Sequence, residues 1–307
     1  MERRTVLDIL WKSLLGLSFG LLSDDLDAAK RKTSEKVIKK KPVVNGTSEN
    51  LEEAIEDYIK ECRRIGKISQ YERTSWVVYD FTTDKKLVSI NEDAPMQAAS
   101  MIKPLVALAY FHEVANKRLN YDKNSKSMLE RSVQKSDNYA TNWIMERLGG
   151  PKKVHQILKR NYGGILINTS IVEYIPAGGG TYLNMASAHD YSRFLYAMWN
   201  DKLPYSKELK RLMGLSKRDR LYDKAKDVPR GTLIYDKTGS TAKLCGDMGI
   251  LVAKGKDGKQ YPYIIVGIIE RDDRTNYYSN WISSRGNIIR QVSNVTYRYM
   301  KRIHNLI

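Results

Sequence analysis

The pattern of apolar and polar positions changes near residue 51, where the folded part of the chain is predicted to begin. Apolar residues then recur three or four positions apart, at Leu51, Ala54, Ile55, Tyr58 and Ile59. This spacing predicts an amphipathic helix, because such positions share one helix face. By contrast, residues 23–50 are rich in Lys, Ser, Asp and Thr and show little periodicity. They are predicted to form a disordered linker.

Strand patterns occur at both ends of the folded region and helical patterns between them. Two apolar segments, 75–81 and 86–90, flank a Thr-Thr-Asp-Lys turn and predict a β-hairpin. Helical patterns follow over 101–118, 126–148 and 186–198. Strand patterns return over 231–237, 247–253 and 263–270, before a final amphipathic helix over 283–303. We therefore expect one α+β domain over residues 51–307, with an antiparallel sheet built from both chain ends and flanked by helices.

The first 22 residues have the character of an export signal. An arginine pair, Arg3 and Arg4, precedes an apolar stretch over 9–22, as in secretory and twin-arginine leaders. Asp8 and Lys12 interrupt this stretch, no A-x-A cleavage site follows, and the stretch is too short and too charged for a membrane-spanning helix. We expect an exported protein, periplasmic or extracellular. A retained amphipathic anchor and a plain cytoplasmic helix are the alternatives.

Charge and composition narrow the choice of partners. The chain has 52 Lys and Arg against 35 Asp and Glu, a net charge of +17. Such a charge suggests nucleic acid, anionic lipid or an acidic polymer as a partner. The excess is dispersed or lies in the basic run 30–41, and such runs are usually solvated segments. Because no nucleic-acid-binding signature accompanies the charge, we expect no nucleic-acid partner. A cationic exported monomer would instead be held near an anionic cell envelope.

Cysteine and histidine spacing gives no support for metal or redox chemistry. The two cysteines, Cys62 and Cys245, lack the short paired spacing of such sites. We expect two unpaired, half-buried thiols, with a single disulfide as the alternative. The four histidines form no HExxH or similar spacing. No metal or other cofactor is predicted.

The strongest chemical motif places Ser100 and Lys103 three residues apart, at the predicted start of a helix. Positions i and i+3 share a helix face. A serine hydroxyl becomes a nucleophile when a neighbouring base takes its proton, and a lysine whose pKa is lowered by burial or nearby charge can be that base. Free N–H groups at the helix start could hold the resulting oxyanion.

Two more motifs follow in the order that acyl transfer needs. Ser136-Asp137-Asn138 falls within the predicted helix 126–148, and Lys237-Thr238-Gly239-Ser240 ends the predicted strand 231–237. Together they supply a hydroxyl and a cation that relay a proton to the leaving nitrogen. They also supply hydroxyls for a substrate carboxylate and a glycine that lets substrate lie against the strand.

With these three motifs the chain resembles the class A β-lactamases and penicillin-binding proteins. The resemblance covers about residues 51–307 and includes the helix and Gly149-Gly150 turn after S-D-N. It implies an α+β sheet with an all-helical subdomain and the site between them. It further implies that Ser100 is acylated, that Lys103 is its base partner and that Ser136 relays the proton.

The resemblance implies substrate contacts for the remaining motif residues. Lys237 is the strand lysine, and Asn138 matches the amide that contacts the substrate side chain. Thr238 and Ser240 match the carboxylate-binding hydroxyls, and Gly239 lies between them. The backbone N–H groups of Ser100 and Ser240 would form the oxyanion hole.

One part of the class A pattern is missing. Class A enzymes resemble one another in an E-x-x-L-N loop whose Glu activates the hydrolytic water, and no such pentapeptide occurs here. Glu173 is the nearest candidate for a catalytic role, but Ala177 stands where the Asn is expected, and the triple glycine 178–180 suggests a flexible loop. An ordinary solvated carboxylate is the equal alternative. The segment between Ser100 and Ser136 is also short, which suggests a trimmed helical subdomain and a more open cleft.

Three functions follow from these motifs. The first is a class A β-lactamase-like serine hydrolase that opens β-lactam amides through an acyl-Ser100 intermediate, as in antibiotic resistance. The second is a penicillin-binding D,D-peptidase or esterase that acts on peptidoglycan stem peptides. The third is a sensor domain that is acylated by a β-lactam and does not turn over. The expected partner is thus a small β-lactam or a peptidoglycan-derived peptide.

Overall fold

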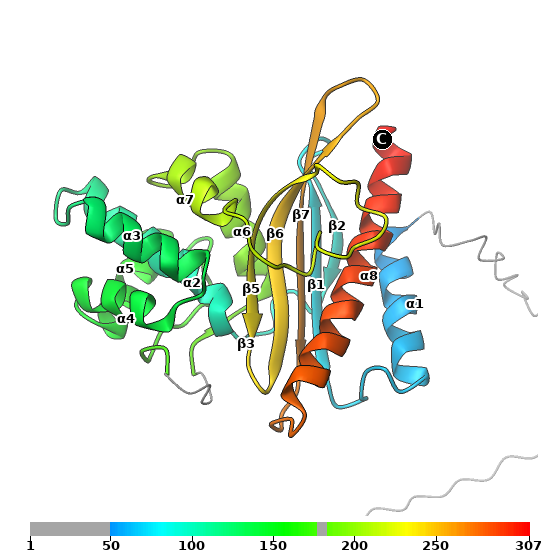
Figure 1. Ribbon diagram of the computed structural model, residues 1–307, viewed down its shortest axis with the longest axis horizontal. Coiled ribbons are helices and arrows are strands. Elements are labelled where there is room, and N and C mark those ends of the chain that lie inside the picture. The colour runs from blue at the N-terminus through cyan, green and yellow to red at the C-terminus, as the bar shows by residue number, and fades with distance from the viewer. Residues whose placement is uncertain (1–49, 177–182) are drawn as a thin grey trace, which may run out of the picture. The chain divides into compact units, whose positions relative to one another are not determined.

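The computed structural model describes residues 50–176 and 183–307 (Figure 1). The predicted leader, 1–22, and nearly all of the predicted linker, 23–50, lie outside the described residues. In the described ranges, none of the helices combines the length and the apolar character that crossing a bilayer requires.

A five-stranded antiparallel sheet runs through the domain in the order β2-β1-β7-β6-β5. Its strands are β1 (Arg73–Asp80), β2 (Lys85–Ile90), β5 (Leu233–Ser240), β6 (Leu244–Lys254) and β7 (Gln260–Glu270). Strand β1 pairs with β7 and sets Trp76 opposite Gly267. Segments from both ends of the chain therefore share one sheet, which confirms the predicted α+β class and the predicted hairpin.

Helices cover both faces of the sheet (Figure 1). One face packs against α1 (Leu51–Arg64) and α8 (Tyr278–His304). The other face packs against α6 (Ala188–Trp199) and α7 (Ser206–Met213). On the same side, further from the sheet, lie α2 (Lys103–Ala115), α3 (Lys123–Val133), α4 (Asn138–Arg147) and α5 (Pro151–Tyr162) (Figure 1). Side chains of β1 alternate between these layers, with Trp76 and Val78 in the α1–α8 core and Val77 in the other, as the two-residue period of a strand requires.

Helix α1 confirms the predicted amphipathic helix. Asn50 caps it by accepting the Glu52 N–H at 3.0 Å, which satisfies one of the free donors of the first turn. Its buried residues are Leu51, Ile55, Ile59 and Cys62. The periodicity near residue 51 therefore marks both the start of the helix and its inner face.

The predicted helices differ from the observed ones where the motifs lie. The predicted helix 126–148 is two helices, α3 and α4, because Ser136 takes a left-handed φ of 57° between them. The predicted helix 101–118 begins with a 3₁₀ turn, η1 (Ala99–Ile102), before α2.

Helix α5 was not predicted, although Pro151 at its start and buried residues at helical spacing were usable signals. Also unpredicted were α7 and the two-stranded sheet of β3 (Met96–Gln97) and β4 (Met185–Ala186).

The two cysteines are unpaired, as expected, but they are more deeply buried than the sequence suggested. Cys62 lies on the inner face of α1. Cys245 lies on β6, with its thiol 3.7 Å from the Ile282 carbonyl of α8. Both sit in the core between the sheet and the α1–α8 layer, so the expectation of half-buried thiols was wrong.

Candidate active site

Ser100 lies in η1 and not in the first turn of α2, which begins at Lys103. The prediction that the serine opens the α-helix was therefore wrong by one turn. The backbone N–H of Lys103 donates to the Ser100 carbonyl, and a 3₁₀ turn has three residues per turn, so residues i and i+3 align along the axis. Ala99 enters the turn with a left-handed φ of 45°. The tighter turn keeps Ser100 and Lys103 on the same side.

The amine of Lys103 is fully buried and faces the S-D-N segment. It donates to the Ser136 carbonyl at 2.5 Å and to Asn138 Oδ1 at 2.8 Å, and it lies 3.3 Å from Ser136 Oγ. Burial, together with the nearby positive charge of Lys237, lowers the pKa of Lys103 to about 7. A lysine in this state can be neutral near neutral pH, as a general base must be.

Lys237 approaches the same hydroxyl from the sheet. Its Nζ lies 3.2 Å from Ser136 Oγ and donates to the Thr238 carbonyl at 3.0 Å. Burial lowers the pKa of Lys237 to about 8, against the opposing effect of Asp236. Ser136 Oγ thus lies between two buried amines, one from α2 and one from β5. The structure brings segments of all three motifs together into one constellation, in which Lys103 and Lys237 contact Ser136 and Gly239 packs against the turn that carries Ser100. The residues of this constellation are Ser100, Lys103, Ser136, Asn138, Lys237, Thr238, Gly239 and Ser240.

The S-D-N segment is a turn between α3 and α4, and its predicted place inside a helix was wrong. Asp137 is the N-cap of α4 and accepts the Ala140 N–H at 3.1 Å, which ends the preceding helix and starts a new one. Asn138 is the first residue of α4. The turn points the carbonyl and hydroxyl of Ser136 toward Lys103, which a continuous helix would not do because its carbonyls bond within the helix.

Gly239 lets strand β5 approach the turn that carries Ser100. A Cβ at Gly239 would lie 2.9 Å from Met101 Cγ and 3.2 Å from Ala99 Cβ. Its partner across the sheet, Gly246 of β6, is equally close to Met101, with 2.7 Å to Cε. Gly246 and Met101 are site residues that the motifs did not predict. Two glycines at paired strand positions were the available signal.

Arg220 is a site residue that no sequence motif predicts. Its guanidinium is buried and donates to Ser240 Oγ at 2.6 Å and to the Gly246 carbonyl at 2.8 Å. Its backbone N–H donates to Asp247 at 2.7 Å. The residue lies in an irregular segment before β5, with no motif around it. Its position adds a fixed positive charge to the end of the K-T-G strand.

Glu173 makes its contacts within its own loop. Its carboxylate accepts the Leu183 N–H, and the Asn184 side chain bonds to the Glu173 backbone on both sides, at 3.2 and 3.1 Å. Within the described part of the chain, this carboxylate makes no hydrogen bond to Ser100 or Lys103. The structure therefore does not join Glu173 to the constellation. The triple glycine that follows lies outside the described residues.

A different loop residue is fastened beside the constellation. Asn142 of α4 accepts the Ile175 N–H at 2.8 Å and donates to the Ile175 carbonyl at 2.9 Å. One turn earlier on the same helix face, Asn138 donates to the Pro176 carbonyl at 3.3 Å. The side chain of Ile175 is buried, with 2% exposed. The loop residue that is hydrogen-bonded to α4 is thus apolar and not a carboxylate.

One group of side chains away from the constellation has the donor types of a metal site. Carboxylate and imidazole atoms of Glu92, Asp93 and His189 lie within 4.8 Å of one another. Two cations already occupy this neighbourhood, since Lys86 lies 2.7 Å from Glu92 and 3.2 Å from His189, and Arg193 lies 2.9 Å from His189. A metal ion would have to displace these charges.

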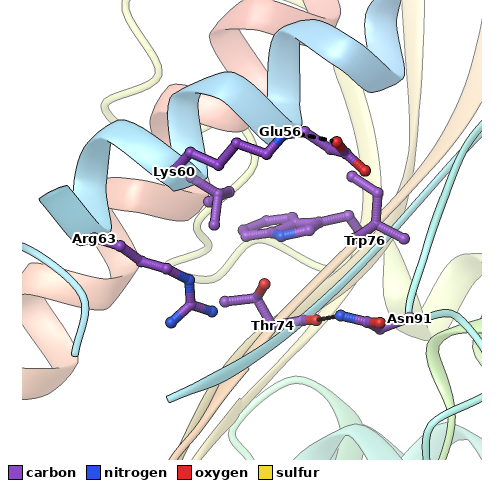
Figure 2. A pocket seen from close by; sticks show the side chains of 8 residues that line it. Glu56, Lys60, Arg63, Thr74, Trp76 and Asn91 are labelled. Atoms are coloured by element: carbon purple, nitrogen blue, oxygen red, sulfur yellow. Dashed lines mark hydrogen bonds and ion pairs between the residues drawn. The ribbon is translucent and has the colours of Figure 1, made fainter. Parts of the chain in front are cut away.

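A separate hollow of about 190 Å³ lies between α1 and the hairpin β1–β2 (Figure 2). Figure 2 shows the Trp76 ring between the side chains of α1 and strand β1. Lys60 at its edge is paired with Glu56 at 2.9 Å. Its lining residues are Glu56, Ile59, Lys60, Arg63, Thr74, Trp76, Ile90 and Asn91. None of the predicted site residues is among them, so this hollow is distinct from the candidate active site.

Most of the chain matches a protein-family model. The model of the β-lactamase enzyme family matches residues 50–128 and 124–300. No curated protein matches the chain in sequence.

Solved structures share this fold at low sequence identity. A mutant of PBP-A, solved as an acyl-enzyme complex with penicillin G, is 22% identical with a TM-score of 0.65, over 82% of this chain and 96% of that chain. An ancestral class A β-lactamase of Gram-negative bacteria is 18% identical with a TM-score of 0.63, over 81% and 99%. A β-lactamase from Xanthomonas campestris is 17% identical with a TM-score of 0.65, over 82% and 99%.

Proposed function

The chain belongs to the β-lactamase enzyme family, and on that premise we propose that it is a serine hydrolase that opens β-lactam amides through an acyl-Ser100 intermediate. One observation carries the proposal: Ser136 Oγ lies between the buried amines of Lys103 and Lys237, at 3.3 and 3.2 Å. A hydroxyl between two amines can accept a proton from one of them and donate its own proton to a reacting group of the substrate. The catalytic unit is the domain from residue 51 to 307.

Acylation then proceeds in balanced proton steps. Ser100 Oγ attacks the lactam carbonyl while its proton passes to the neutral amine of Lys103. The proton returns through Ser136 Oγ to the lactam nitrogen as the C–N bond breaks. The charge of Lys237 favours the developing negative charge. The product is an ester between Ser100 and the opened lactam.

Residues of the K-T-G strand and their neighbours would bind the substrate. The hydroxyls of Thr238 and Ser240 would bind the substrate carboxylate, with Arg220 supplying the positive charge behind Ser240. Gly239 lets the substrate lie along β5, and Asn138 contacts its side chain. The backbone N–H groups of Ser100 and Ser240 would hold the oxyanion.

A second function, a penicillin-binding D,D-peptidase or esterase on peptidoglycan stem peptides, is favoured by one specific observation. The carboxylate of Glu173 is bonded to Leu183, and the loop residue clamped to α4 is the apolar Ile175. Without a carboxylate to activate water, deacylation is slow. Slow deacylation also fits the third candidate, a sensor domain that stays acylated after it reacts with a β-lactam. All three fit an exported monomer held near an anionic envelope by its positive charge.

Time-resolved mass spectrometry of the intact protein with penicillin G tests the proposal. We expect one covalent adduct on Ser100 in the parent protein and none in Ser100→Ala. An adduct that disappears rapidly indicates a β-lactamase, whereas an adduct that persists indicates the penicillin-binding or sensor function. Labelling of Ser100→Ala to the parental extent would refute acylation at Ser100.

A further inference from the structure

Ser136 has a backbone conformation that residues with a side chain rarely adopt. Its φ of 57° lies in the left-handed region, where Cβ crowds the backbone. In this conformation the carbonyl and the hydroxyl of Ser136 both face the Lys103 amine, at 2.5 and 3.3 Å. The hydroxyl also lies 3.2 Å from Lys237. The contacts of both lysines therefore depend on one unfavourable backbone conformation.

Arg131 holds the residues on both sides of Ser136. Its carbonyl accepts the N–H groups of Lys135 and Asp137, both at 3.1 Å. Its guanidinium donates to Asp137 Oδ2 from Nε at 2.9 Å and from a terminal nitrogen at 2.5 Å. The other carboxylate oxygen of Asp137 accepts the Ala140 N–H and caps α4. The chain is thus fastened immediately before and after Ser136, and Arg131 contributes to both attachments.

Neighbouring groups orient this ion pair. The guanidinium of Arg131 lies 5.9 Å from the centre of the Tyr139 ring, and its second terminal nitrogen lies 3.9 Å from Met128 Sδ. Burial raises the pKa of Asp137, but hydrogen bonds from the Ala140 N–H and from Arg131 outweigh it and hold that pKa below its ordinary value. The Arg131 side chain is 40% exposed, and partly exposed ion pairs contribute little to global stability.

We propose that Arg131 is a positioning residue that acts through Asp137 and Ser136 to hold the relay hydroxyl between Lys103 and Lys237. This inference rests on the proposed function, because the relay has a task only where Ser100 is acylated. An arginine suits the role, since two nitrogens of one rigid plane converge on a single oxygen of Asp137 and fix its position.

Removal of the guanidinium has a consequence for Lys103. The Ser136 backbone then keeps only the contacts of the Arg131 carbonyl and the cap of α4. It can relax toward an ordinary conformation and turn its carbonyl away from the lysine amine. A carbonyl acceptor favours the charged ammonium, so its loss lowers the pKa of Lys103. The Asp137 carboxylate acts in the opposite direction, but the carbonyl contacts the amine directly at 2.5 Å, so we expect its loss to be the larger effect. The pH at which acylation is half-maximal should move down, while the maximal rate falls because the hydroxyl leaves its place.

The test compares Arg131→Gln with a matched control, Arg118→Gln. Arg118 also makes a two-nitrogen ion pair, with both carboxylate oxygens of Glu113 at 2.5 and 2.8 Å, outside the constellation. Acylation by a fluorescent penicillin is followed by stopped flow between about pH 5 and 9. We expect Arg131→Gln to be acylated roughly 10- to 100-fold more slowly, with a lower pH midpoint, and Arg118→Gln to match the parent. Parental rates and a parental pH midpoint in Arg131→Gln would overturn the inference.

A double-mutant comparison separates positioning from a general loss of stability. In the Ser136→Ala background, Arg131→Gln should slow acylation far less than in the parent, because the relay hydroxyl is already absent. Equal slowing in both backgrounds would reject the inference. Arg131→Lys, which keeps the charge but not the rigid plane, replaces Arg131→Gln if the latter does not fold and should give a smaller loss of the same kind.

The experiments distinguish a failure of the proposed function from a failure of the proposed role of Arg131. A parent protein that is not acylated on Ser100 contradicts the proposed function, whatever the role of Arg131. The conformational claim is then decided by NMR titration of Lys103 in the parent and in Arg131→Gln. A lower pKa of Lys103 in the variant supports the role of Arg131, and an unchanged pKa contradicts it.

Discussion

The hydroxyl of Ser136 lies 3.3 Å from the amine of Lys103, and the carbonyl of the same residue accepts a hydrogen bond from that amine at 2.5 Å. Lys237 of β5 contacts the same hydroxyl, at 3.2 Å. Burial lowers the pKa of both lysines, to about 7 for Lys103 and about 8 for Lys237. Near neutral pH the first can accept a proton while the second keeps its charge.

The pH dependence of the acylation rate should reflect the titration of both lysines. Below about pH 7 Lys103 is protonated and cannot accept the Ser100 proton, so the rate should rise as pH increases through 7. Above about pH 8 Lys237 loses its charge, so the rate should fall. Single-turnover acylation by a fluorescent penicillin, measured across this range, should give a bell-shaped profile. A rate that keeps rising to pH 10, where an ordinary lysine titrates, would contradict it.

Gly239→Ala should separate η1 from β5. The new Cβ would lie 2.9 Å from Met101 Cγ and 3.2 Å from Ala99 Cβ, and such overpacking costs about 1–3 kcal/mol. We expect a lower melting temperature and slower acylation, because Ser100 moves with η1. Gly164→Ala is the control, since nothing lies within 4 Å of a Cβ at that position. Equal stability and equal rates of the two variants would show that the close approach is unimportant.

Arg220→Gln should weaken recognition of the substrate carboxylate. The guanidinium lies 2.6 Å from Ser240 Oγ, and loss of a buried charge that faces a carboxylate costs about 2–5 kcal/mol. We expect kcat/KM for penicillin G to fall mainly through KM. The methyl ester of penicillin G, which lacks the carboxylate, serves as the control substrate and should react equally with parent and variant. A matching loss for both substrates would indicate a structural effect instead.

Glu173→Gln should leave deacylation nearly unchanged. The carboxylate accepts a backbone N–H from Leu183, and an amide oxygen can take the same place. We expect the lifetime of the penicillin adduct, followed by mass spectrometry, to stay close to that of the parent. If Glu173 were the base for the hydrolytic water, the adduct would persist roughly 10²- to 10⁴-fold longer, and the β-lactamase function would gain strong support.

A protein that begins at Asn50 should keep the stability and the acylation rate of the full chain. Asn50 retains the cap of α1, and Leu51 is the first buried residue of that helix. The residues before it lack the periodicity of a core-forming segment. Melting temperature and acylation rate of the shortened and full-length proteins are the measurements. An insoluble or inactive shortened protein would contradict the predicted boundary at residue 51.

Local patterns were sufficient for the class of the fold and for most of the motif chemistry. The apolar spacing from Leu51 predicted α1. Two apolar segments around a turn predicted the hairpin, and further strand patterns predicted the strands that return toward the end of the chain. Short motifs predict Ser100, Lys103, Ser136 and Lys237 as site residues without any knowledge of their contacts. These features could be read from the sequence because periodicity and short motifs depend on residues within a few positions of one another.

Tertiary structure alone decided how the motifs meet. The left-handed turn at Ser136, the clamp of Asn142 on Ile175, the bond of Glu173 to Leu183 and the place of Arg220 behind Ser240 all depend on strand register and on the packing of helices distant in sequence. The single sequence carries no record of such contacts, because each is made by residues whose separation along the chain is unrelated to their separation in space. The motif residues were therefore determined by sequence, and their geometry by the fold.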